Sequence, residues 1–383
     1  MSKEGWTTVT LGDIAENISV RVDDPSKSGL DRFVGLVHLS SGSVIVSRWD
    51  SAESVTSTMK RFQAGDVLLA RRNAHLRRAS AVDFEGVCSG DAYVLREKPD
   101  AIVPGLLKYI LNTNRFWEYA IANADGSMST RVKWKHIIDY KVRLQSTDNQ
   151  IQSLDILEAM VEYQTSTKEV ITSLETCMKK VRQNSISELS HNNDAVTMAD
   201  CCDLITKGQS PRWQGFEYTD SGMLFITSEN VGEGELLLEK LKYLPEEFGE
   251  HLGKSVTKPG DLLINIVGSL GRASLAPEDI RAGLNQAVCV LRPNEKYHSD
   301  YLLEVVLSLE TQRYFLSRSV STAQPNLTLE HIRKIPIPEV SLLEQKKLAS
   351  RLKSIRMSIS SSRIASSNSR IATKSCIDAL LEG

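Results

Sequence analysis

The sequence repeats itself, and this repeat limits what the chain can fold into more than any other feature. The matching pairs are residues 62–69 with 257–264, 78–80 with 272–274, 93–96 with 289–292, 135–137 with 330–332, and Gln150 with Gln345. These matches keep their order at offsets of 194 to 196 residues. A period of this length is too long for a solenoid or a propeller blade. The chain therefore contains one unit twice, each a domain followed by a further segment.

Each unit begins with a mixed pattern of strands and helices and ends with a long helical pattern. Runs of Val, Ile and Leu bounded by Gly, Ser or Asp predict strands, for example at residues 33–39, 43–46, 66–70, 224–227 and 261–267. Helical patterns follow at residues 104–122 and 299–316. We therefore predict an α+β fold, with α/β lobes at residues 1–145 and 191–340 and helical regions at 146–190 and 341–383.

The two helical regions are expected to pair as an antiparallel coiled coil. Residues 148–189 and 341–381 contain neither Pro nor Gly, and a helix of 40 residues would be about 60 Å long. Apolar residues recur at coiled-coil spacing. The predicted pairing residues are Leu154, Leu157, Val161, Val170, Leu174, Val181, Leu348, Leu352, Ile355 and Ile359. Each lobe would then lie at one end of a rod, related to the other by a pseudo-twofold axis.

The charges of the two helices favour this pairing. Residues 148–175 hold six acidic residues against Lys168, whereas residues 346–374 hold eight basic residues and no acidic one. Opposite charges across a seam select the partner and its orientation. Two alternatives stay open, namely two solvated helices on separate cores, and a basic helix that contacts nucleic acid or an acidic partner.

The composition is that of an ordinary globular protein, with 41% apolar and 25% charged residues. The longest apolar runs, such as residues 262–267, are far shorter than the ~20 residues that span a bilayer, and residues 1–6 carry no apolar signal segment. The six cysteines show no Cys-x-x-Cys and no zinc-like spacing, which indicates incidental thiols in a reducing compartment and no metal site. We expect a cytoplasmic, nucleoid-associated protein.

Basic and polar clusters in the first lobe predict contact with DNA. Arginine can bind the O6 and N7 edge of guanine through two hydrogen bonds, asparagine can do the same for adenine, and Ser and Lys suit phosphates. The candidates are Arg71, Arg72, Asn73, His75, Arg77, Arg78, Ser129, Arg131, Lys133 and Lys135. The alternative is a pair of solvated loops, and Trp134 is expected to pack into the core of the lobe.

The second lobe offers polar loops in place of a dense basic cluster. Gly, Ser, Gln, Asn and Arg in loops can bind base edges, although turns use the same residues. The candidates here are Lys207, Gln209, Ser210, Arg212, Asn230, Ser269, Arg272, Gln324 and Asn326.

No enzyme motif stands out in the sequence. Residues 268–272 lack the Gly-Lys-Ser/Thr ending of a Walker A loop, and no His-Glu-x-x-His or Gly-x-Ser-x-Gly occurs. The tetrapeptide of amino-methyltransferases and a convincing nuclease cluster are also missing. We therefore predict no catalytic residue in this chain.

Several strings in their order resemble the specificity subunit of type I restriction–modification systems. They are residues 6–14, Gly65-Asp66-Val67-Leu68 followed by Arg71-Arg72-Asn73, residues 86–96, Pro336-Ile337-Pro338 before Leu342-Leu343-Glu344-Gln345, and residues 377–383. The resemblance covers essentially the whole chain. The start of the first long helix, residues 144–150, departs from it because it lacks the proline and the glutamate.

The resemblance implies a non-catalytic DNA reader with two target-recognition domains, each for one half of an asymmetric bipartite target. It implies that the helices set the spacer and dock two methyltransferase subunits, which restriction–translocase subunits would join. S-adenosylmethionine, ATP and Mg²⁺ would then sit on these partners and not on this chain. The net charge of −2 predicts weak DNA binding alone and tight binding with the methyltransferase.

Three other interpretations remain. The first is a specificity module of another DNA modification or defence system, and the second is a protein-binding scaffold. A stand-alone nuclease or methyltransferase is a third, which the missing motifs disfavour. Four Arg within residues 71–78 argue against the scaffold, because such a loop is a poor core for a protein interface.

Overall fold

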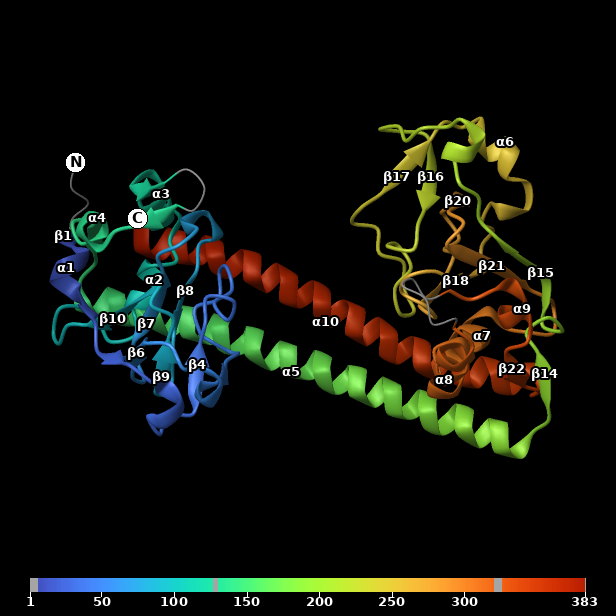
Figure 1. Cartoon of the computed structure of the whole chain (residues 1–383), viewed down its shortest axis with the longest axis horizontal. Helices are drawn as coiled ribbons and strands as arrows, with labels where there is room; N and C mark the ends of the chain where they lie inside the picture. Colours follow the sequence, from blue (N-terminus) through green and yellow to red (C-terminus); the bar gives the residue numbers. More distant parts are fainter. Residues whose placement is uncertain (1–5, 127–129, 320–325, 383) are drawn as a thin grey trace. The chain divides into compact units, whose positions relative to one another are not determined.

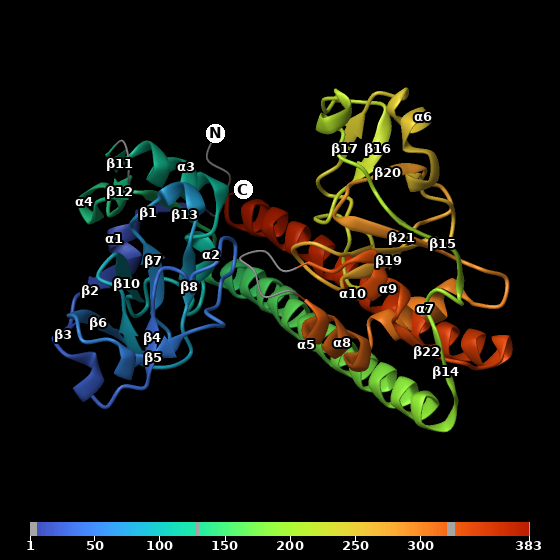
Figure 2. The ribbon, with the colours of Figure 1, turned by 45° about the vertical axis from the view of Figure 1, so that its right-hand side comes forward.

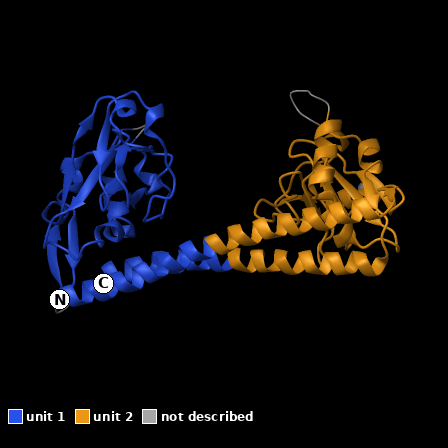
Figure 3. Cartoon of the chain, turned by 90° about the horizontal axis from the view of Figure 1, so that it is seen from below, with its two compact units in different colours: residues 1–168, 364–383 blue, residues 169–363 orange. Residues whose placement is uncertain are grey.

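The computed structural model describes residues 6–126, 130–319 and 326–382. The chain forms two compact units, residues 1–168 with 364–383 and residues 169–363 (Figure 3). Each unit holds one mixed lobe and part of two long helices, α5 (Thr147–Asn192) and α10 (Leu342–Glu382) (Figure 1). The end of α10 therefore belongs to the same unit as the first lobe.

The first lobe is built on a four-stranded antiparallel sheet of order β2-β10-β7-β8. A five-stranded sheet, β3-β6-β9-β4-β5, contains the parallel pair β4–β9, and β1 pairs with β13. The elements are β1 (Thr7–Thr10), α1 (Leu11–Ile14), β2 (Ala15–Ile18), β3 (Arg21–Val22), β4 (Arg32–Val34), β5 (Asp50–Ser51), β6 (Met59–Phe62), β7 (Val67–Ala70), β8 (Ala79–Ala81), β9 (Gly86–Cys88), β10 (Ala92–Glu97), α2 (Leu107–Ile110), α3 (Asn114–Ala122), β11 (Ala124–Asp125), β12 (Arg131–Val132), α4 (Trp134–Ile137) and β13 (Lys141–Leu144).

The second lobe repeats this plan. Its four-stranded sheet has the equivalent order β15-β21-β18-β19, and the sheet β17-β16-β20 again contains a parallel pair, β16–β20. The elements are β14 (Ala195–Thr197), β15 (Cys202–Lys207), β16 (Met223–Ile226), β17 (Lys242–Leu244), α6 (Phe248–Leu252), β18 (Leu262–Asn265), β19 (Ala273–Leu275), β20 (Ala282–Leu284), β21 (Val288–Pro293), α7 (Ser299–Val306), α8 (Leu309–Arg318), α9 (Leu329–Arg333) and β22 (Pro336–Pro338). Within this unit, α7 and α8 lie beside the long helices, and α6 with β16 and β17 lies at the far end of the lobe (Figure 2).

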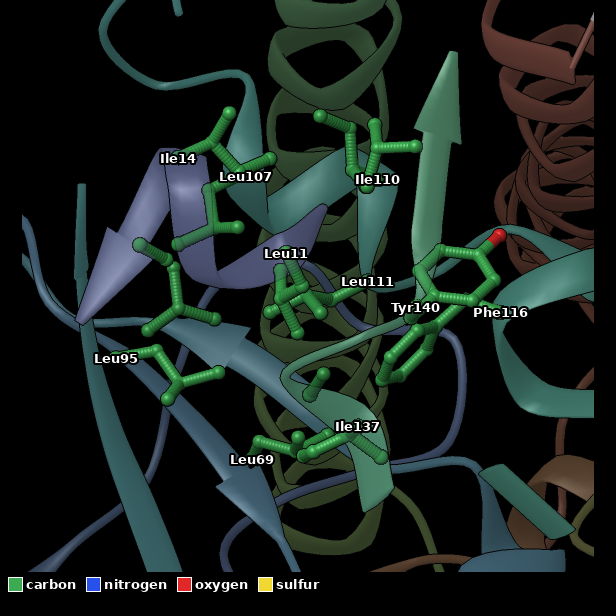
Figure 4. Packing of buried hydrophobic residues seen from close by; sticks show 14 of the residues in the cluster. Leu11, Ile14, Leu69, Leu95, Leu107, Ile110, Leu111, Phe116, Ile137 and Tyr140 are labelled. Atoms are coloured by element: carbon green, nitrogen blue, oxygen red, sulfur yellow. The ribbon is translucent and has the colours of Figure 1, made fainter. Parts of the chain in front are cut away.

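The central strands are continuous apolar runs because both faces of the sheet are covered. Successive side chains of a strand point to opposite faces. Val67 and Leu69 of β7 therefore join the cluster that packs against α2, whereas Leu68 and Ala70 join the cluster shared with the five-stranded sheet. Figure 4 shows the first of these clusters, in which Leu69 lies among residues from the helices.

The matched glutamines tie each long helix to its own lobe. Gln150, near the start of α5, accepts a hydrogen bond through Oε1 from the Val103 amide at 3.1 Å. Gln345, near the start of α10, accepts one from the His298 amide at 2.8 Å. Each side-chain amide also donates to a carbonyl of the loop before its helix. The repeat in the sequence is therefore a repeat of contacts.

The helices α5 and α10 run antiparallel within each unit. In the first, Leu157 shares a buried cluster with Ile377, and further along α5 the Gln164 amide donates to Thr373 Oγ1 at 2.6 Å. In the second, Arg363 of α10 forms an ion pair with Glu175 of α5 at 2.7 Å. Among the described residues, none of the helices combines the length and the apolar character that a bilayer-spanning segment needs.

One predicted pairing residue does not lie on the pairing face. Leu157, Leu348, Leu352 and Ile359 are buried, and Leu154, Val161, Leu174, Val181 and Ile355 are half-buried. Val170, in contrast, is 50% exposed, while Ile171 is half-buried. The half-buried residues Ile171, Leu174, Met178 and Val181 follow the 3-4-3 spacing of a coiled-coil seam, and Val170 lies one position before this seam. Its assignment to the pairing face was wrong.

Candidate nucleic-acid interface

The first lobe brings its two predicted basic clusters together. Arg72, in the loop after β7, forms an isolated antiparallel bridge with Arg131 of β12. Two backbone hydrogen bonds of 2.8 Å flank this bridge, one donated by the Asn73 amide and one accepted by the Arg71 carbonyl. Segments that are far apart in the sequence thus form one region, residues 71–78 with 130–135, which we call the basic surface.

Asp91 lies at the centre of three arginines of the basic surface. Its Oδ1 accepts a hydrogen bond from Arg71 Nε at 3.0 Å, and its Oδ2 accepts one from Arg72 Nη1 at 3.2 Å. Arg131 Nη2 lies 3.7 Å from Oδ1. Burial alone would raise the pKa of Asp91, but the bonds from Arg71 and Arg72 and the charge of Arg131 outweigh it, and the pKa is lowered. The ionised carboxylate therefore fixes the position of three guanidinium groups.

The loop itself has an unusual backbone. Asn73 and Arg77, which flank the 3-10 helix Ala74–Leu76, have positive φ angles of 54° and 47°. Asparagine tolerates the left-handed region, whereas arginine adopts it only when the surrounding structure holds it there. Arg77 is held by a hydrogen bond of 2.7 Å from its Nη1 to Asn114 Oδ1.

Not every candidate of the first lobe is equally placed for a ligand. His75, Arg131, Lys133 and Lys135 are exposed, and Lys133 forms a 2.7 Å ion pair with Asp125. Ser129 lies outside the described residues. Trp134 is half-buried and packs against the core, as expected.

Arg78 has a structural role. It donates to the carbonyls of Leu36, at 2.8 Å, and of Arg72, at 3.2 Å, and burial lowers the pKa of its guanidinium. Its hydrogen bonds therefore stabilise the backbone of the basic surface, and we do not include Arg78 among the residues that contact a ligand.

The second lobe builds an equivalent loop and bridge with one arginine, Arg272, in place of the arginine cluster. Val267 bridges Asn326, as Arg72 bridges Arg131 in the first lobe. The loop bends at Gly268 and Gly271, with φ angles of 78° and 74°. Ser269, Arg272 and Asn326 are exposed on it, while Gln324 lies outside the described residues. Glycine here supplies the left-handed conformation that Asn73 and Arg77 adopt in the first lobe.

A second group of candidates follows β15. Lys207 and Arg212 are exposed, Ser210 is half-buried, and the Gln209 side chain accepts a hydrogen bond from Gln214. Trp213, within the same loop, is 89% exposed.

Asn230 is not a surface residue. It is 2% exposed, its Oδ1 accepts from the amide and hydroxyl of Thr227 at 3.0 Å, and its Nδ2 donates to two carbonyls of residues 237–240. A ligand could reach it only if the loop opened. Its predicted contact with DNA has no support in this placement, since the amide is used to shape the loop.

Sequence reasoning missed three residues of these regions, namely Asp91, Asn114 and Trp213. Asp91 stands between two strands, 20 residues from Arg71, but Asp83 and Glu85 lie nearer to the arginine cluster in the sequence, so the sequence does not single it out. Trp213 is a large apolar residue in a polar loop, which is visible in the sequence. Nothing in the sequence points to Asn114, because its partners come from distant segments.

Residues 193–365 match a family described as Type I restriction modification DNA specificity domain. The chain is similar to type I DNA specificity domains over this range. It is 26% identical over 212 residues to the type I restriction enzyme MjaVIII specificity subunit of Methanocaldococcus jannaschii, covering 54% of this chain and 49% of that one. It is 26% identical over 135 residues to the EcoBI specificity subunit of Escherichia coli, covering 35% of this chain and 28% of that one.

Solved structures share the fold of this chain. The S subunit of a type I restriction–modification system from M. genitalium superimposes with a TM-score of 0.61 at 13% identity, covering 100% of this chain and 97% of that one. A chain from a study of complex assembly and conformational transition of the type I R-M system gives 0.60 at 20% identity, covering 99% and 97%. The resemblance to specificity subunits and the predicted fold class are both confirmed. The chain spans about half the length, or less, of the curated relatives it matches.

Proposed function

We propose that this chain is the DNA sequence-specificity subunit of a type I restriction–modification complex, with each lobe reading one half of a bipartite target. The observation that carries the proposal is the basic surface, where Arg71, Arg72 and Arg131 converge on Asp91. Three preset guanidinium groups suit a ligand with guanine edges and phosphates. The family match supports the same conclusion.

The two lobes would read DNA in different ways. In the first, arginine forks would bind guanine edges and Asn73 could bind adenine, while Lys133 and Lys135 neutralise phosphates. In the second, Ser269, Arg272 and Asn326 would act from the equivalent loop through polar and shape contacts. An asymmetric target follows, because the two equivalent loops carry different chemistry.

Apolar residues on the outer faces of the long helices suggest where partners dock. In the first unit, Ile156 and Tyr163 of α5 are 47% and 52% exposed, and Ile364 and Ile371 of α10 are 60% and 65% exposed. Each pair is spaced seven residues apart, which is the repeat that packs one helix on another. We propose that helices of two methyltransferase subunits cover these faces.

Catalysis would then belong to the partners. The methyltransferase subunits would bind S-adenosylmethionine, restriction–translocase subunits would bind ATP and Mg²⁺, and this chain would supply only recognition. A chain with net charge −2 would bind DNA weakly alone and tightly in the complex. The complex would act on DNA in the cytoplasm.

Selection from a random duplex library tests the proposal, with the chain alone and with its methyltransferase partner. We expect a two-part motif with a fixed gap, enriched only with the partner. The double variant Arg71→Ala with Arg72→Ala should lose one half of the motif. Arg61→Ala, an exposed arginine of β6 in the same lobe, should keep both halves.

Two other results would overturn the proposal. A motif selected without the methyltransferase would indicate a specificity module of another system. No motif in either case would indicate a protein-binding scaffold.

A further inference from the structure

The C-terminal helix reaches the basic surface through one asparagine. Asp378 of α10 accepts two hydrogen bonds from Asn114, one from the backbone amide at 2.8 Å and one from the side-chain Nδ2. The Asn114 Oδ1 accepts the bond from Arg77 Nη1 at 2.7 Å. All three residues belong to the first compact unit.

The orientation of the Asn114 amide is decided by Asp378. A carboxylate accepts hydrogen bonds and cannot donate them when ionised, so the NH₂ end of Asn114 must face Asp378. The oxygen end must then face away, toward Arg77. The Asp378 carboxylate therefore determines which end of the Asn114 amide faces Arg77, and with it the position of the Arg77 guanidinium.

The same acid also holds the helix that carries Asn114. Asp378 accepts from the first amide of α3, and Glu382 accepts from the next, the Arg115 amide, at 2.7 Å. Carboxylates at a helix N-terminus bind its unpaired amides and are stabilised by the helix dipole. The end of α10 thus fixes both the position of α3 and the direction of its Asn114 side chain.

The second unit contains the hydrogen bond to the first helix amide, but not the side-chain link that joins Asp378 to Arg77 through Asn114. Gln183 of α5, 195 residues before Asp378, accepts from the Leu309 amide at 3.3 Å, and Leu309 stands 195 residues after Asn114. Leucine has no side-chain amide that Gln183 could orient, and the Gln183 Nε2 donates instead to Glu310 Oε1 of α8 at 2.7 Å. The cap is therefore the shared structural feature, and the link to an arginine is specific to the first unit.

We infer that Asp378 is a positioning residue for DNA reading, which acts through Asn114 on Arg77 and so makes one base preference of the first lobe depend on the C-terminal helix. This inference rests on the proposed function. Arg77 has a left-handed backbone, and its guanidinium is anchored at a distance from it. Loss of the anchor would leave a long side chain free to sample many positions, and a base contact needs one.

The experiment compares base preferences by library selection with the methyltransferase complex of the full chain. The variants are Asp378→Asn, Asn114→Ala and, as the matched control, Gln183→Ala. Asn114→Ala keeps the backbone amide that caps α3 and removes only the side-chain link, so it remains informative if Asp378→Asn does not fold. Gln183→Ala removes the equivalent cap from the second unit.

We expect Asp378→Asn and Asn114→Ala to weaken the preference at one base pair of the first half-site by about tenfold, the range of one arginine contact. The second half-site should not change, and Arg77→Ala should affect the same base pair without adding to the loss in Asn114→Ala. Gln183→Ala should leave the first half-site unchanged.

The inference would be overturned if Asn114→Ala kept the full preference, or if both half-sites weakened equally, since the latter indicates general destabilisation. Failure of the proposed function looks different, because the unmodified complex would then select no two-part motif at all.

Discussion

Arg96 and Asp66 form a two-pronged ion pair on the sheet of the first lobe, with Nε–Oδ1 and Nη2–Oδ2 distances of 2.7 and 2.9 Å. Arg292 and Asp261 form the same pair in the second lobe, at 2.9 and 2.7 Å. Both aspartates are 1% exposed and belong to the Gly-Asp strings of the repeat. The most visible sequence match between the two units is therefore a buried charge and its partner.

Asp66→Asn should lower the free energy of unfolding by about 2–3 kcal/mol, because a neutral amide replaces a buried carboxylate that accepts hydrogen bonds from Arg96 and from the Gln63 amide. Denaturant unfolding of the whole chain measures this. Arg61→Ala breaks the exposed pair with Glu85 and should cost less than about 1 kcal/mol. Equal effects of the two variants would contradict the assignment of a structural role to the buried pair.

Asp91→Asn should make DNA binding less specific and more dependent on salt. The three arginines around Asp91 would lose a common acceptor and could turn to phosphates. Affinity measured against salt concentration, on target and on random duplex, checks this. Specific binding that is unchanged while the salt slope stays the same would show that Asp91 does not orient the arginines.

The lowered pKa of Asp91 determines its pH dependence. The ionised Asp91 contributes to the stability of the folded state. This contribution is fully present above the pKa of the unfolded carboxyl, and it is lost as the pH falls through the lower pKa of the folded state. We therefore expect no change in base preference from this group between neutral and mildly acidic pH. A preference lost in mild acid would have to come from another group.

Glu304 holds a buried charge network in the second unit. It accepts from Arg182 of α5 at 2.7 Å and from Arg356 of α10. The residues 195 positions away in the first unit are Tyr109, Ile377 and Val161, which form an apolar cluster there.

Replacing the three charged residues by the apolar residues of the first unit should separate the contribution of their charges to stability from that of their packing. Glu304→Gln should cost about 3–5 kcal/mol, because the buried Arg182 and the half-buried Arg356 lose their charged partner. The triple variant Glu304→Tyr, Arg182→Ile and Arg356→Val should be as stable as the unmodified chain or more so. Denaturant unfolding measures both. A triple variant less stable than the unmodified chain would contradict the prediction.

Ile364→Glu together with Ile371→Glu should prevent assembly with the methyltransferase and leave folding intact. Both side chains are largely exposed, so the free energy of unfolding should change by less than about 0.5 kcal/mol. Size-exclusion chromatography of the mixed subunits measures assembly. Ala372→Glu, at an exposed position of the same helix about 80–100° around the axis from Ile364 and Ile371, is the control. Normal assembly of the double variant would rule out this face as the docking surface.

The sequence by itself determined the duplication, the α+β lobes, the two long helices and the arginine cluster of residues 71–78. These features depend on local patterns, such as apolar periodicity, Pro- and Gly-free segments and charge density, which are written in consecutive residues. The pairing face was predicted less well at Val170, because the register of a coiled coil depends on the partner helix as well as on spacing.

The tertiary structure decided which residues meet. It joined Arg72 to Arg131, directed three arginines to Asp91, buried Asn230, and brought Asp378 to Asn114 across 264 residues of sequence. A hydrogen bond or ion pair depends on distance in space, and any of the many acids in this chain could have been the partner of an arginine. Only the folded backbone selects among them.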